Sequence, residues 1–460
     1  MWSLALKSEG ISEKCKFVVL RGMLSSYKRA CTQVPRSWAA TRSLVTAAYV
    51  WGEGTVGQLG LGPVKMNRKS FDNSKFHVGQ VPRMIPASKN LNFTDLALGG
   101  KFSLGLTADG HLYGWGKFWG LGNEGKVEVL EPTALSLEPK FTGIGAGKSH
   151  GAAIDKDGQV YTFGRYKVED KKGFFSWLDI SAPEGGWLGH GDNAACDTPR
   201  LVESFRDYGA RAKKVVCGDK HTLILTDDGE VLACGVGEQG RLGTSDVGIA
   251  WQPQTLETLL EETVVDLACG GDSSYALTEK NEVFVWGNNG RGQLGLSDTF
   301  VDINSVQPVP LKADLEELGG RAIKKVTACG QRAAILTEDG KVYIWGYGHA
   351  SVPTELIMGS YYADHGQNPD GSDDPVVDLA IAGGQRRKHV LTLVLRSGLL
   401  VTMGDSATGL LARPGLMGRQ ALDRCDKFAP KPKDALPMVT RVFSGLGMHA
   451  ACLVDRTRKV

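Results

Sequence analysis

The chain of 460 residues lacks the features that define several common classes of protein. No uninterrupted apolar run reaches the 18 residues or more of a membrane-spanning helix, so no transmembrane segment is predicted. The nine cysteines include no C-x-x-C pair, which argues against a zinc or redox motif. We also find no nucleophile beside a base and no predicted carboxylate pair. The sequence therefore predicts no catalytic residue, no metal site and no cofactor, and the protein is not expected to be an enzyme.

The sequence instead contains one pattern that is repeated seven times. Each copy has a small-residue turn, a strand, a charged turn often of Asp-Gly type, a second strand and an aromatic-glycine stop. The aromatic position holds tryptophan in four copies and substitutes in three, at Trp51, Trp115, Phe163, Cys234, Trp286, Trp345 and Met403. The mean spacing of about 59 residues exceeds that of the commoner propeller repeats. Repetition of this kind predicts a propeller or another repeat architecture.

The first and last copies are incomplete and complement each other. The stop at Trp51 has no opening before it, and the opening at Val442–Val454 has no stop after it. Pairing of these two segments would make one blade from both ends of the chain. Such closure would remove the exposed sheet edges of an open array.

Turn and proline residues indicate how each copy is built. The Asp-Gly pairs predict two-residue hairpins between antiparallel strands, at Asp109-Gly110, Asp157-Gly158, Asp228-Gly229 and Asp339-Gly340. A proline later in the copy would be tolerated best in an outer, edge strand. These prolines are Pro82, Pro132, Pro199, Pro253, Pro308 and Pro437.

The repeat resembles that of the regulator of chromosome condensation family. Cys217-Gly-Asp-Lys-His221 through Gly235 matches the family pattern almost residue for residue, and the resemblance covers about residues 47 to 455. It implies an all-β, seven-bladed β-propeller in which the N- and C-terminal strands close the ring. Its histidine position holds His150, His221 and His449, and we assign Ser103, Ser273, Ala333 and Arg387 to that position in other copies. We expect each histidine to bond to backbone inside its own blade, and Trp51, Trp115, Trp286 and Trp345 to be structural.

Several motifs that suggest chemistry fall into register with the repeat. G-x-G-x-x-G occurs at 52–57 and 235–240, but each leads into another glycine turn and not into the helix that a dinucleotide site needs. The segment 143–149 resembles a phosphate-binding loop but has Thr142 where the first glycine is required. Cys217, Cys269 and Cys329 share one position before a glycine and are expected to be small buried residues.

Residues 1–46 form a different kind of segment, a basic leader predicted to be disordered. The first 48 residues hold eight lysines and arginines and two glutamates, a net charge of +6 in a chain of net +2, which leaves the propeller near −4. From Met23 to the first blade there is no acidic residue, which is typical of a mitochondrial transit peptide. Glu9 and Glu13 do not fit that role, so Met23 is an alternative start to Met1. The other interpretation is a basic arm that contacts DNA or an acidic protein.

Function is expected where copies depart from the pattern, because insertions on a rigid propeller are where partners bind. We predict a single propeller over 47–460 with insertions at about 63–90, 165–197, 347–374 and 405–436. The second insertion is aromatic and the third holds two tyrosines, which makes these residues candidates for partner binding. They are Phe174, Phe175, Trp177, Trp187, Tyr361 and Tyr362. The alternative is that the rings pack the insertion onto its own blade.

The sequence is consistent with two functions. The first is a non-enzymatic interaction propeller in mitochondria, in the matrix or at the inner membrane, that scaffolds a ribosomal or respiratory complex; in a ribosomal particle it could also contact RNA. The resemblance implies such roles for mitochondrial members of the family. The second is guanine-nucleotide exchange on a small or dynamin-like GTPase, the activity for which the family is best known. The near-neutral to acidic propeller argues against direct chromatin binding, although a nuclear or cytoplasmic location remains the alternative.

Overall fold

The computed structural model describes most of the repeat region. The described residues are 46–62, 78–117, 128–136, 138–165, 185–297, 306–356, 374–383, 389–404, 421–424, 438–447 and 449–455. By its internal contacts the chain divides into Met1–Ser43 and Leu44–Val460, and all described residues belong to the second unit. Within the described residues, no helix is both long and apolar enough to cross a bilayer.

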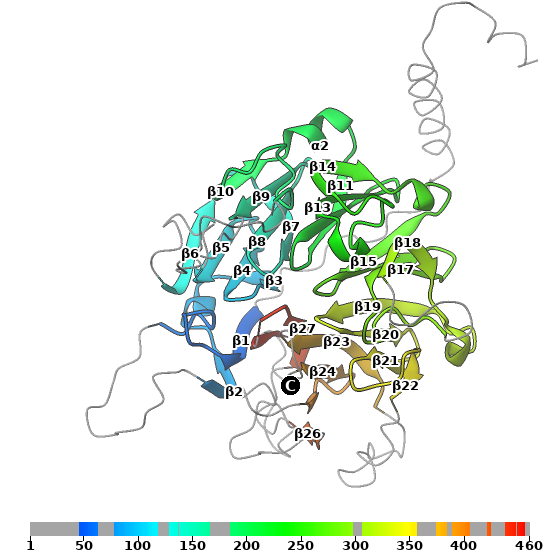
Figure 1. Ribbon diagram of the computed structural model, residues 1–460. Helices are drawn as coiled ribbons and strands as arrows, with labels where there is room; N and C mark the ends of the chain where they lie inside the picture. The colour runs from blue at the N-terminus through cyan, green and yellow to red at the C-terminus, as the bar shows by residue number, and fades with distance from the viewer. Residues whose placement is uncertain are drawn as a thin grey trace, which may run out of the picture. The chain divides into compact units, whose positions relative to one another are not determined.

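The second unit is an all-β propeller of seven four-stranded antiparallel sheets, as the sequence predicts (Figure 1). The first strand of each blade contacts the first strands of its neighbours, so these seven strands surround the axis. We number the blades from the one that contains both ends of the unit. The innermost strands, from blade 1 to blade 7, are β27 (Met438–Ser444), β3 (Phe93–Leu98), β7 (Phe141–Ala146), β11 (Ala212–Cys217), β15 (Val264–Cys269), β19 (Ile323–Cys329) and β23 (Val376–Gly383).

The other strands follow outwards in the same order in every blade. The second strands are β28 (His449–Asp455), β4 (Phe102–Thr107), β8 (His150–Asp155), β12 (His221–Thr226), β16 (Ser273–Thr278), β20 (Arg332–Thr337) and β24 (His389–Leu395). The third strands are β1 (Thr46–Glu53), β5 (Leu112–Gly116), β9 (Val160–Gly164), β13 (Val231–Val236), β17 (Val283–Asn288), β21 (Val342–Gly346) and β25 (Leu400–Gly404). The fourth strands are β2 (Val78–Met84), β6 (Val129–Ser136), β10 (Cys196–Leu201), β14 (Ile249–Thr255), β18 (Val306–Lys312), β22 (Thr354–Glu355) and β26 (Ala421–Arg424).

Short helical turns occupy some connections between these strands. They are the helix α2 (Glu203–Tyr208) and the 3₁₀ turns η1 (Pro86–Lys89), η4 (Glu238–Gly240), η5 (Glu257–Leu259) and η6 (Glu316–Leu318). Three of these 3₁₀ turns follow the fourth strand of a blade and lead to the next innermost strand, as α2 does. Each of these connections buries one residue, such as Phe205 of α2 and Leu259 of η5.

Blade 1 is built from both ends of the propeller, which confirms the predicted closure. Strand β1 pairs with β28 along most of its length, from Thr46 opposite Asp455 to Gly52 opposite His449. Ala48, Val50 and Trp51 are fully buried in this sheet. Closure therefore gives β28 a hydrogen-bonded neighbour on both sides.

The hairpins between second and third strands are one residue longer than predicted. In blade 4, Thr226 bonds to Glu230 and leaves three residues, 227–229, in the turn. Only the glycine has a positive φ, +85° at Gly229, whereas a two-residue type I′ turn would require one at the aspartate too. A three-residue turn with glycine in the left-handed region also reverses the direction of the chain between the two strands.

The prolines confirm the outer strands in five blades and correct one assignment. Pro82, Pro132, Pro199, Pro253 and Pro308 lie in β2, β6, β10, β14 and β18, where a missing backbone donor costs little. Pro437 lies outside the described residues, directly before the innermost strand β27, and is not part of the outer strand β26.

Alternating strand directions give the propeller two different faces. One end, which we call the glycine face, carries the connections from first to second and from third to fourth strands. The other end, the hairpin face, carries the Asp-Gly hairpins and the connections between blades. In the sequence, the segments 63–77, 166–184 and 405–420 come between third and fourth strands, and the ends of these strands that they connect are at the glycine face.

The structure narrows the predicted insertions. Strand β2 and η1 occupy the end of 63–90, and β26 divides 405–436. The predicted insertion at 347–374 is interrupted by the short strand β22, and residues 357–373 lie outside the described residues.

The glycines that open each repeat are explained by crowding around the axis. At the glycine face, backbone hydrogen bonds link successive blades, as from Gly100 N to Gly147 O (3.2 Å) and from Asp219 N to Gly271 O (2.9 Å). A Cβ on Gly147 would lie 2.5 Å from the carbonyl oxygen of Gly218. Gly143 and Gly145 lie in strand β7, so the segment that resembles a phosphate loop is an ordinary blade opening.

Candidate interaction surface

Three of the tryptophan stops fasten their blade to the blade before it. Trp115, Trp286 and Trp345 are fully buried, and each donates its indole N–H to a carbonyl in the preceding blade. The acceptors are Gln58 O at 2.9 Å, Arg241 O at 3.0 Å and Gln293 O at 2.8 Å. All three acceptors occupy the same place in the glycine turn between third and fourth strands.

The three histidines at the histidine position also connect blades. This corrects the expectation that they bond within one blade. Nε2 of His150, His221 and His449 lies 2.9 Å from a hydroxyl of the next blade, on Thr222, Ser274 and Ser103 respectively. Each hydroxyl in turn donates to a turn carbonyl of the histidine's own blade, as Ser103 does to Gln58 O at 2.8 Å. We call this histidine–hydroxyl–carbonyl chain the blade staple.

Burial holds the staple histidines in the neutral form. Desolvation lowers the pKa of His150 to about 3 and that of His449 to about 4. A neutral imidazole makes one donor and one acceptor available and adds no buried charge. Each staple histidine therefore joins two blades as a neutral group.

The strand register corrects the histidine position in three other blades. His150 and His221 stand opposite the stop glycines Gly164 and Gly235. By the same criterion the position holds Phe102, Ser273, Arg332 and Val390 in blades 2, 5, 6 and 7. The assignments of Ser103 and Ala333 were each one residue too late, and Arg387 lies outside the described residues. Ser273 was assigned correctly.

Trp187 does not face a partner. Its side chain is 1% exposed, its ring lies 6.2 Å from that of His150, and its carbonyl accepts a hydrogen bond from Thr222 at 2.7 Å. The reason is that Gly186-Trp187-Leu188-Gly189 occupies the place of Gly57-Gln58-Leu59-Gly60 in the repeat. The same G-x-L-G pattern can be recognised in the sequence at 186–189. The run of aromatic residues before it led to the assignment of Trp187 to an insertion.

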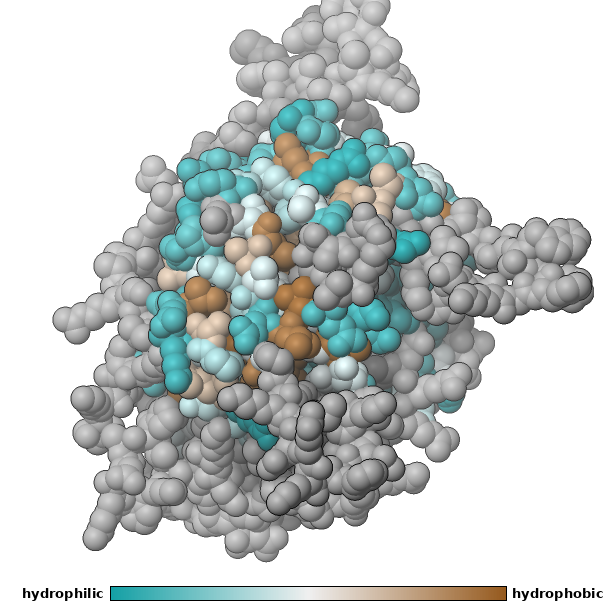
Figure 2. Space-filling model, turned by 90° about the vertical axis from the view of Figure 1, so that its left-hand side faces the viewer, coloured by the Kyte–Doolittle hydropathy of each residue, from teal (hydrophilic) through white to brown (hydrophobic). Residues whose placement is uncertain are grey.

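The remaining aromatic candidates, Phe174, Phe175, Trp177, Tyr361 and Tyr362, lie outside the described residues. Among the described residues, the large apolar side chains that are exposed are Tyr208, Val247, Val265 and Val306. Figure 2 shows one side of the propeller, on which described apolar residues are interspersed with hydrophilic ones. The described part of the surface thus offers no large aromatic patch.

A ring of charged residues surrounds the axis towards the hairpin face, and sequence reasoning missed it. Every innermost strand has a register shift near its start, and one residue of the strand directly follows that shift. These residues form the ring. β-Bulges of this kind re-aim side chains. From blade 1 to blade 7 the residues are Arg441, Asp95, Gly143, Lys214, Asp266, Lys325 and Asp378.

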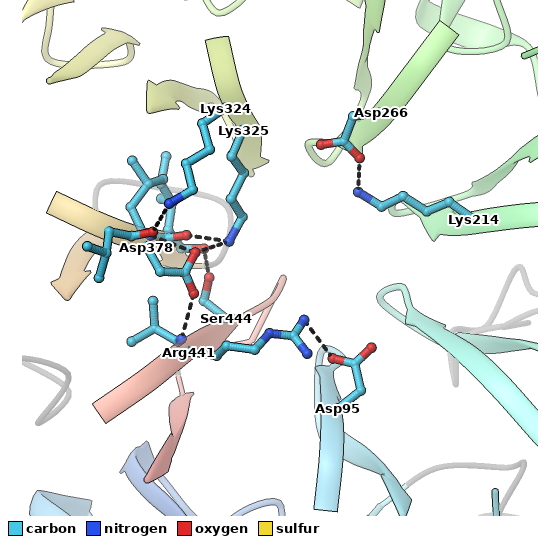
Figure 3. Close-up of polar contacts among 12 residues, drawn as sticks. Asp95, Lys214, Asp266, Lys324, Lys325, Asp378, Arg441 and Ser444 are labelled. Carbon is cyan, nitrogen blue, oxygen red and sulfur yellow. Dashed lines mark hydrogen bonds and ion pairs between the residues drawn. The ribbon is translucent and has the colours of Figure 1, made fainter. Parts of the chain in front are cut away.

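Ion pairs join these residues between neighbouring blades (Figure 3). Lys214 contacts Asp266 at 2.5 Å, Lys325 contacts Asp378 at 2.7 Å and Arg441 contacts Asp95 at 3.2 Å. Each base also donates to a backbone carbonyl of the same neighbouring blade, at Leu267, Leu379 and Thr94. Burial raises the pKa of Asp95, and the charge of Arg441 opposes this effect.

The charges alternate around the ring, and Gly143 is the neutral member. An odd number of blades cannot alternate throughout, so one position must face a like charge on one side. A charge at 143 would lie between Asp95 and Lys214 and would gain on one side what it lost on the other. Space is not the constraint, because a Cβ there would meet only the Ile154 side chain, at 3.5 Å or more.

A second group of charges lies on the glycine face of blades 3 to 5. Lys148 contacts the buried Asp219 at 3.2 Å, and the buried Arg241 contacts Asp272 at 3.0 Å. Desolvation raises the pKa of Asp219, and the nearby charge of Asp272 raises it further against the effect of Lys148. The groups are mutually paired, and no set of three or more potential metal ligands occurs among the described residues.

The predicted cysteines are confirmed as largely buried small residues. Cys217 and Cys329 are buried and Cys269 is partly buried, and all three are free thiols. Desolvation raises the pKa of Cys217 to about 12, so the reactive thiolate is disfavoured.

Comparison with known proteins agrees with this architecture. The model of the RCC1-like domain family matches residues 47–451. The human E3 ubiquitin-protein ligase HERC2 is 30% identical over 394 residues, 82% of this chain but 7% of HERC2. The mitochondrial RCC1 domain-containing protein RUG3 of Arabidopsis thaliana is 28% identical over 302 residues, 65% of this chain and 61% of that protein. The chain therefore spans less than two thirds of these relatives.

Solved structures show the same fold. Human WBSCR16 has a TM-score of 0.69 at 21% identity, with 90% of this chain and 100% of that chain covered. Prp20p from Saccharomyces cerevisiae has a TM-score of 0.68 at 20% identity, with 90% of this chain and 92% of that chain covered. Prp20p is described as having binding properties towards Gsp1p and histones.

Proposed function

Because the chain belongs to the RCC1-like domain family, we propose that it is a non-enzymatic interaction propeller that acts in mitochondria. There it would scaffold or assist the assembly of an organelle complex, ribosomal or respiratory. Contact with RNA inside a ribosomal particle is compatible with this role. Direct chromatin binding is not part of the proposal, because the propeller has a net charge near −4.

The observation that carries the interaction role is the placement of the insertions. The segments 63–77, 166–184 and 405–420 belong to blades 1, 3 and 7, far apart in sequence, yet the strand ends that they connect are all at the glycine face. The blades beneath are joined by staples, indole hydrogen bonds and axial backbone bonds. Variable segments on a rigid support favour recognition of a partner at that face.

The mitochondrial location rests on the leader and on one relative. Residues 23–48 are basic and free of acid, and RUG3 is named as a mitochondrial protein. Fusion of residues 1–48, and separately 23–48, to a fluorescent reporter tests whether the leader is a mitochondrial targeting signal. We expect at least one fusion to enter mitochondria, and a nuclear or cytoplasmic signal from both would contradict the proposal.

The partner is tested by purification of the tagged full chain from mitochondria and sedimentation of what accompanies it. We expect stable co-migration with a large particle, ribosomal or respiratory. Replacement of 166–184 by a short linker should weaken this association. The same change at 425–437, which connects strand ends at the hairpin face, should not. Migration of the intact chain alone, without any large particle, would contradict the scaffold role.

A second candidate function is guanine-nucleotide exchange on a small or dynamin-like GTPase. It is supported by 30% identity over 227 residues to the mouse RCC1-like G exchanging factor-like protein, which covers 48% of this chain and 45% of that protein. The test is release of labelled GDP from a co-purifying GTPase. Loss of that release on removal of 166–184, with unchanged release on removal of 425–437, would favour exchange over scaffolding. The deletion should stop at 184, because Trp187 and Leu188 belong to the buried core.

A further inference from the structure

Blade 6 departs from the staple scheme in a way that leaves a cation without a counter-ion in the described part of the chain. The histidine position of this blade holds Arg332, opposite the stop glycine Gly346. The next blade would have to supply a hydroxyl, but the equivalent residue there is the buried, apolar Leu391. Arg332 donates its Nε–H to Tyr347 O at 2.5 Å, and no carboxylate pairs with it among the described residues.

Two histidines lie near enough to this guanidinium for its charge to lower their pKa values. The turn that follows β21 folds back so that His349 N bonds to Gly346 O at 2.8 Å, and Gly346 stands directly opposite Arg332 in the ladder. A Cβ on Gly348 would lie 3.0 Å from Nη2 of Arg332, which places the guanidinium against this turn. His349 is exposed to solvent.

The other histidine, His389, begins β24 in blade 7, one residue before Val390, which is the equivalent of Arg332. Arg332 is paired with Cys329 across β19 and β20, and His389 is paired with Gly383 across β23 and β24. The Cys329 thiol lies 2.9 Å from Gly383 O and so joins the two pairs. His389 is 2% exposed, and neither of its ring nitrogens has a hydrogen-bond partner in the described part of the chain.

The electrostatics of the three residues agree with this placement. Burial lowers the pKa of His389 to about 4, and the charges of Arg332 and His349 contribute to this shift. Partial desolvation of the His349 ring lowers its pKa as well, with Arg332 as the second cause. At neutral pH the group therefore holds one fixed positive charge and two neutral imidazoles, each with an N–H to donate. Within the described residues, no carboxylate contributes to the pKa shift of any of the three.

We propose that Arg332, His349 and His389 form a binding site for an oxyanion, the carboxylate or phosphate group of a ligand, between blades 6 and 7 on the glycine face. A partly buried guanidinium without a counter-ion is costly, and so is a buried imidazole without a partner. An oxyanion accepts from the planar fork of the guanidinium and from both imidazoles. The site does not depend on the proposed mitochondrial role.

Titration of the full-length protein with inorganic phosphate, and separately with acetate, tests the site by NMR of labelled histidines. We expect saturable shifts of the His349 and His389 signals and a rise in the pKa of His349, because a bound negative charge stabilises the imidazolium. Tighter binding of phosphate assigns a phosphate group, and tighter binding of acetate assigns a carboxylate.

Variants decide whether the shifts come from this site. Arg332→Gln should weaken binding at least tenfold, and Arg332→Lys should retain part of it because the charge remains. Arg396→Gln, at an exposed arginine on the hairpin side of blade 7, should bind as the parent does. The proposal is overturned if the parent shows no saturable shift at either histidine, or if Arg332→Gln binds both anions as the parent does.

Discussion

Single buried side chains have a larger structural role than their chemistry first suggests. The staple histidines and the indole donors all direct their polar atoms at a neighbouring blade. A buried polar group that loses its partner costs about 1–3 kcal/mol. Substitutions at these positions should therefore act on stability and not on partner binding.

Trp187 gives the clearest test of this distinction. Trp187→Ala should destabilise the propeller by about 3–5 kcal/mol, because a fully buried indole is removed and a cavity remains. Tyr208→Ala, at an exposed aromatic residue, should cost less than about 1 kcal/mol. Thermal melting of the two variants measures the difference. Equal melting temperatures together with selective loss of a partner in Trp187→Ala would return this residue to the binding surface.

The staple histidines predict a loss of stability in mild acid. Their pKa values are lowered in the folded state, to about 3 for His150 and about 4 for His449, so the unfolded chain takes up these protons first. Stability should fall as the pH drops from about 6.5 towards 4, by up to about 1.4 kcal/mol per pH unit for each histidine.

Urea unfolding at several pH values measures this slope. His449→Gln should make it shallower, because one titrating group is removed. Ser103→Ala, which breaks the same staple at its hydroxyl, should lower stability and keep the slope. An unchanged slope in His449→Gln would show that this histidine does not contribute.

At the level of elements, the innermost strands are held by two different systems. Near the glycine face their backbones bond directly, which requires glycine at the points of contact. Near the hairpin face their bulges present the charged ring. Asp378 joins blades 6, 7 and 1, because it accepts from Lys325, from Leu379 N and from Val442 N, the last at 2.9 Å.

We expect Asp378→Ala to cost about 2–3 kcal/mol, since the Val442 and Leu379 donors and the Lys325 charge all lose their acceptor. Asp266→Ala is the matched control, because within the described residues its carboxylate accepts from Lys214 and from Leu267 N but from no third blade. The side chains of Asp266 and Lys214 are more exposed than those of Asp378 and Lys325. The loss of stability in Asp266→Ala should therefore be about 1 kcal/mol. Chemical denaturation compares the two, and an equal loss would contradict the three-blade role of Asp378.

For the whole molecule, closure by β1 and β28 predicts that the position of the chain ends is not essential. Thr46 and Asp455 are paired neighbours, where the other six blades have a hairpin. A permutant that joins them with a short Asp-Gly turn and opens the chain between Asp228 and Gly229 should melt within about 5 °C of the parent. A permutant opened inside β12, between Leu223 and Ile224, should not fold. Failure of both would show that closure depends on the native ends.

The repeat made most of the fold predictable from the sequence. Glycine, tryptophan, proline and Asp-Gly positions each reflect a local backbone requirement, so seven blades, outer strands and closure could be predicted. The hairpin length was wrong because two- and three-residue turns share the Asp-Gly signal. The histidine position was misplaced in three blades because without a histidine as landmark the position is defined only by the strand register.

The sequence by itself determined the seven-bladed ring. Strand periodicity and turn residues are local properties, and they can be recognised in each copy of the repeat separately. Only the tertiary structure decided which side chains meet, because those contacts join residues about 50 or more apart and, across the closure, 346 apart. The alternation of the charged ring, the crossing of the staples and the surroundings of the Arg332 cation are properties of neighbouring blades. They exist only once the ring is closed and each strand register is fixed.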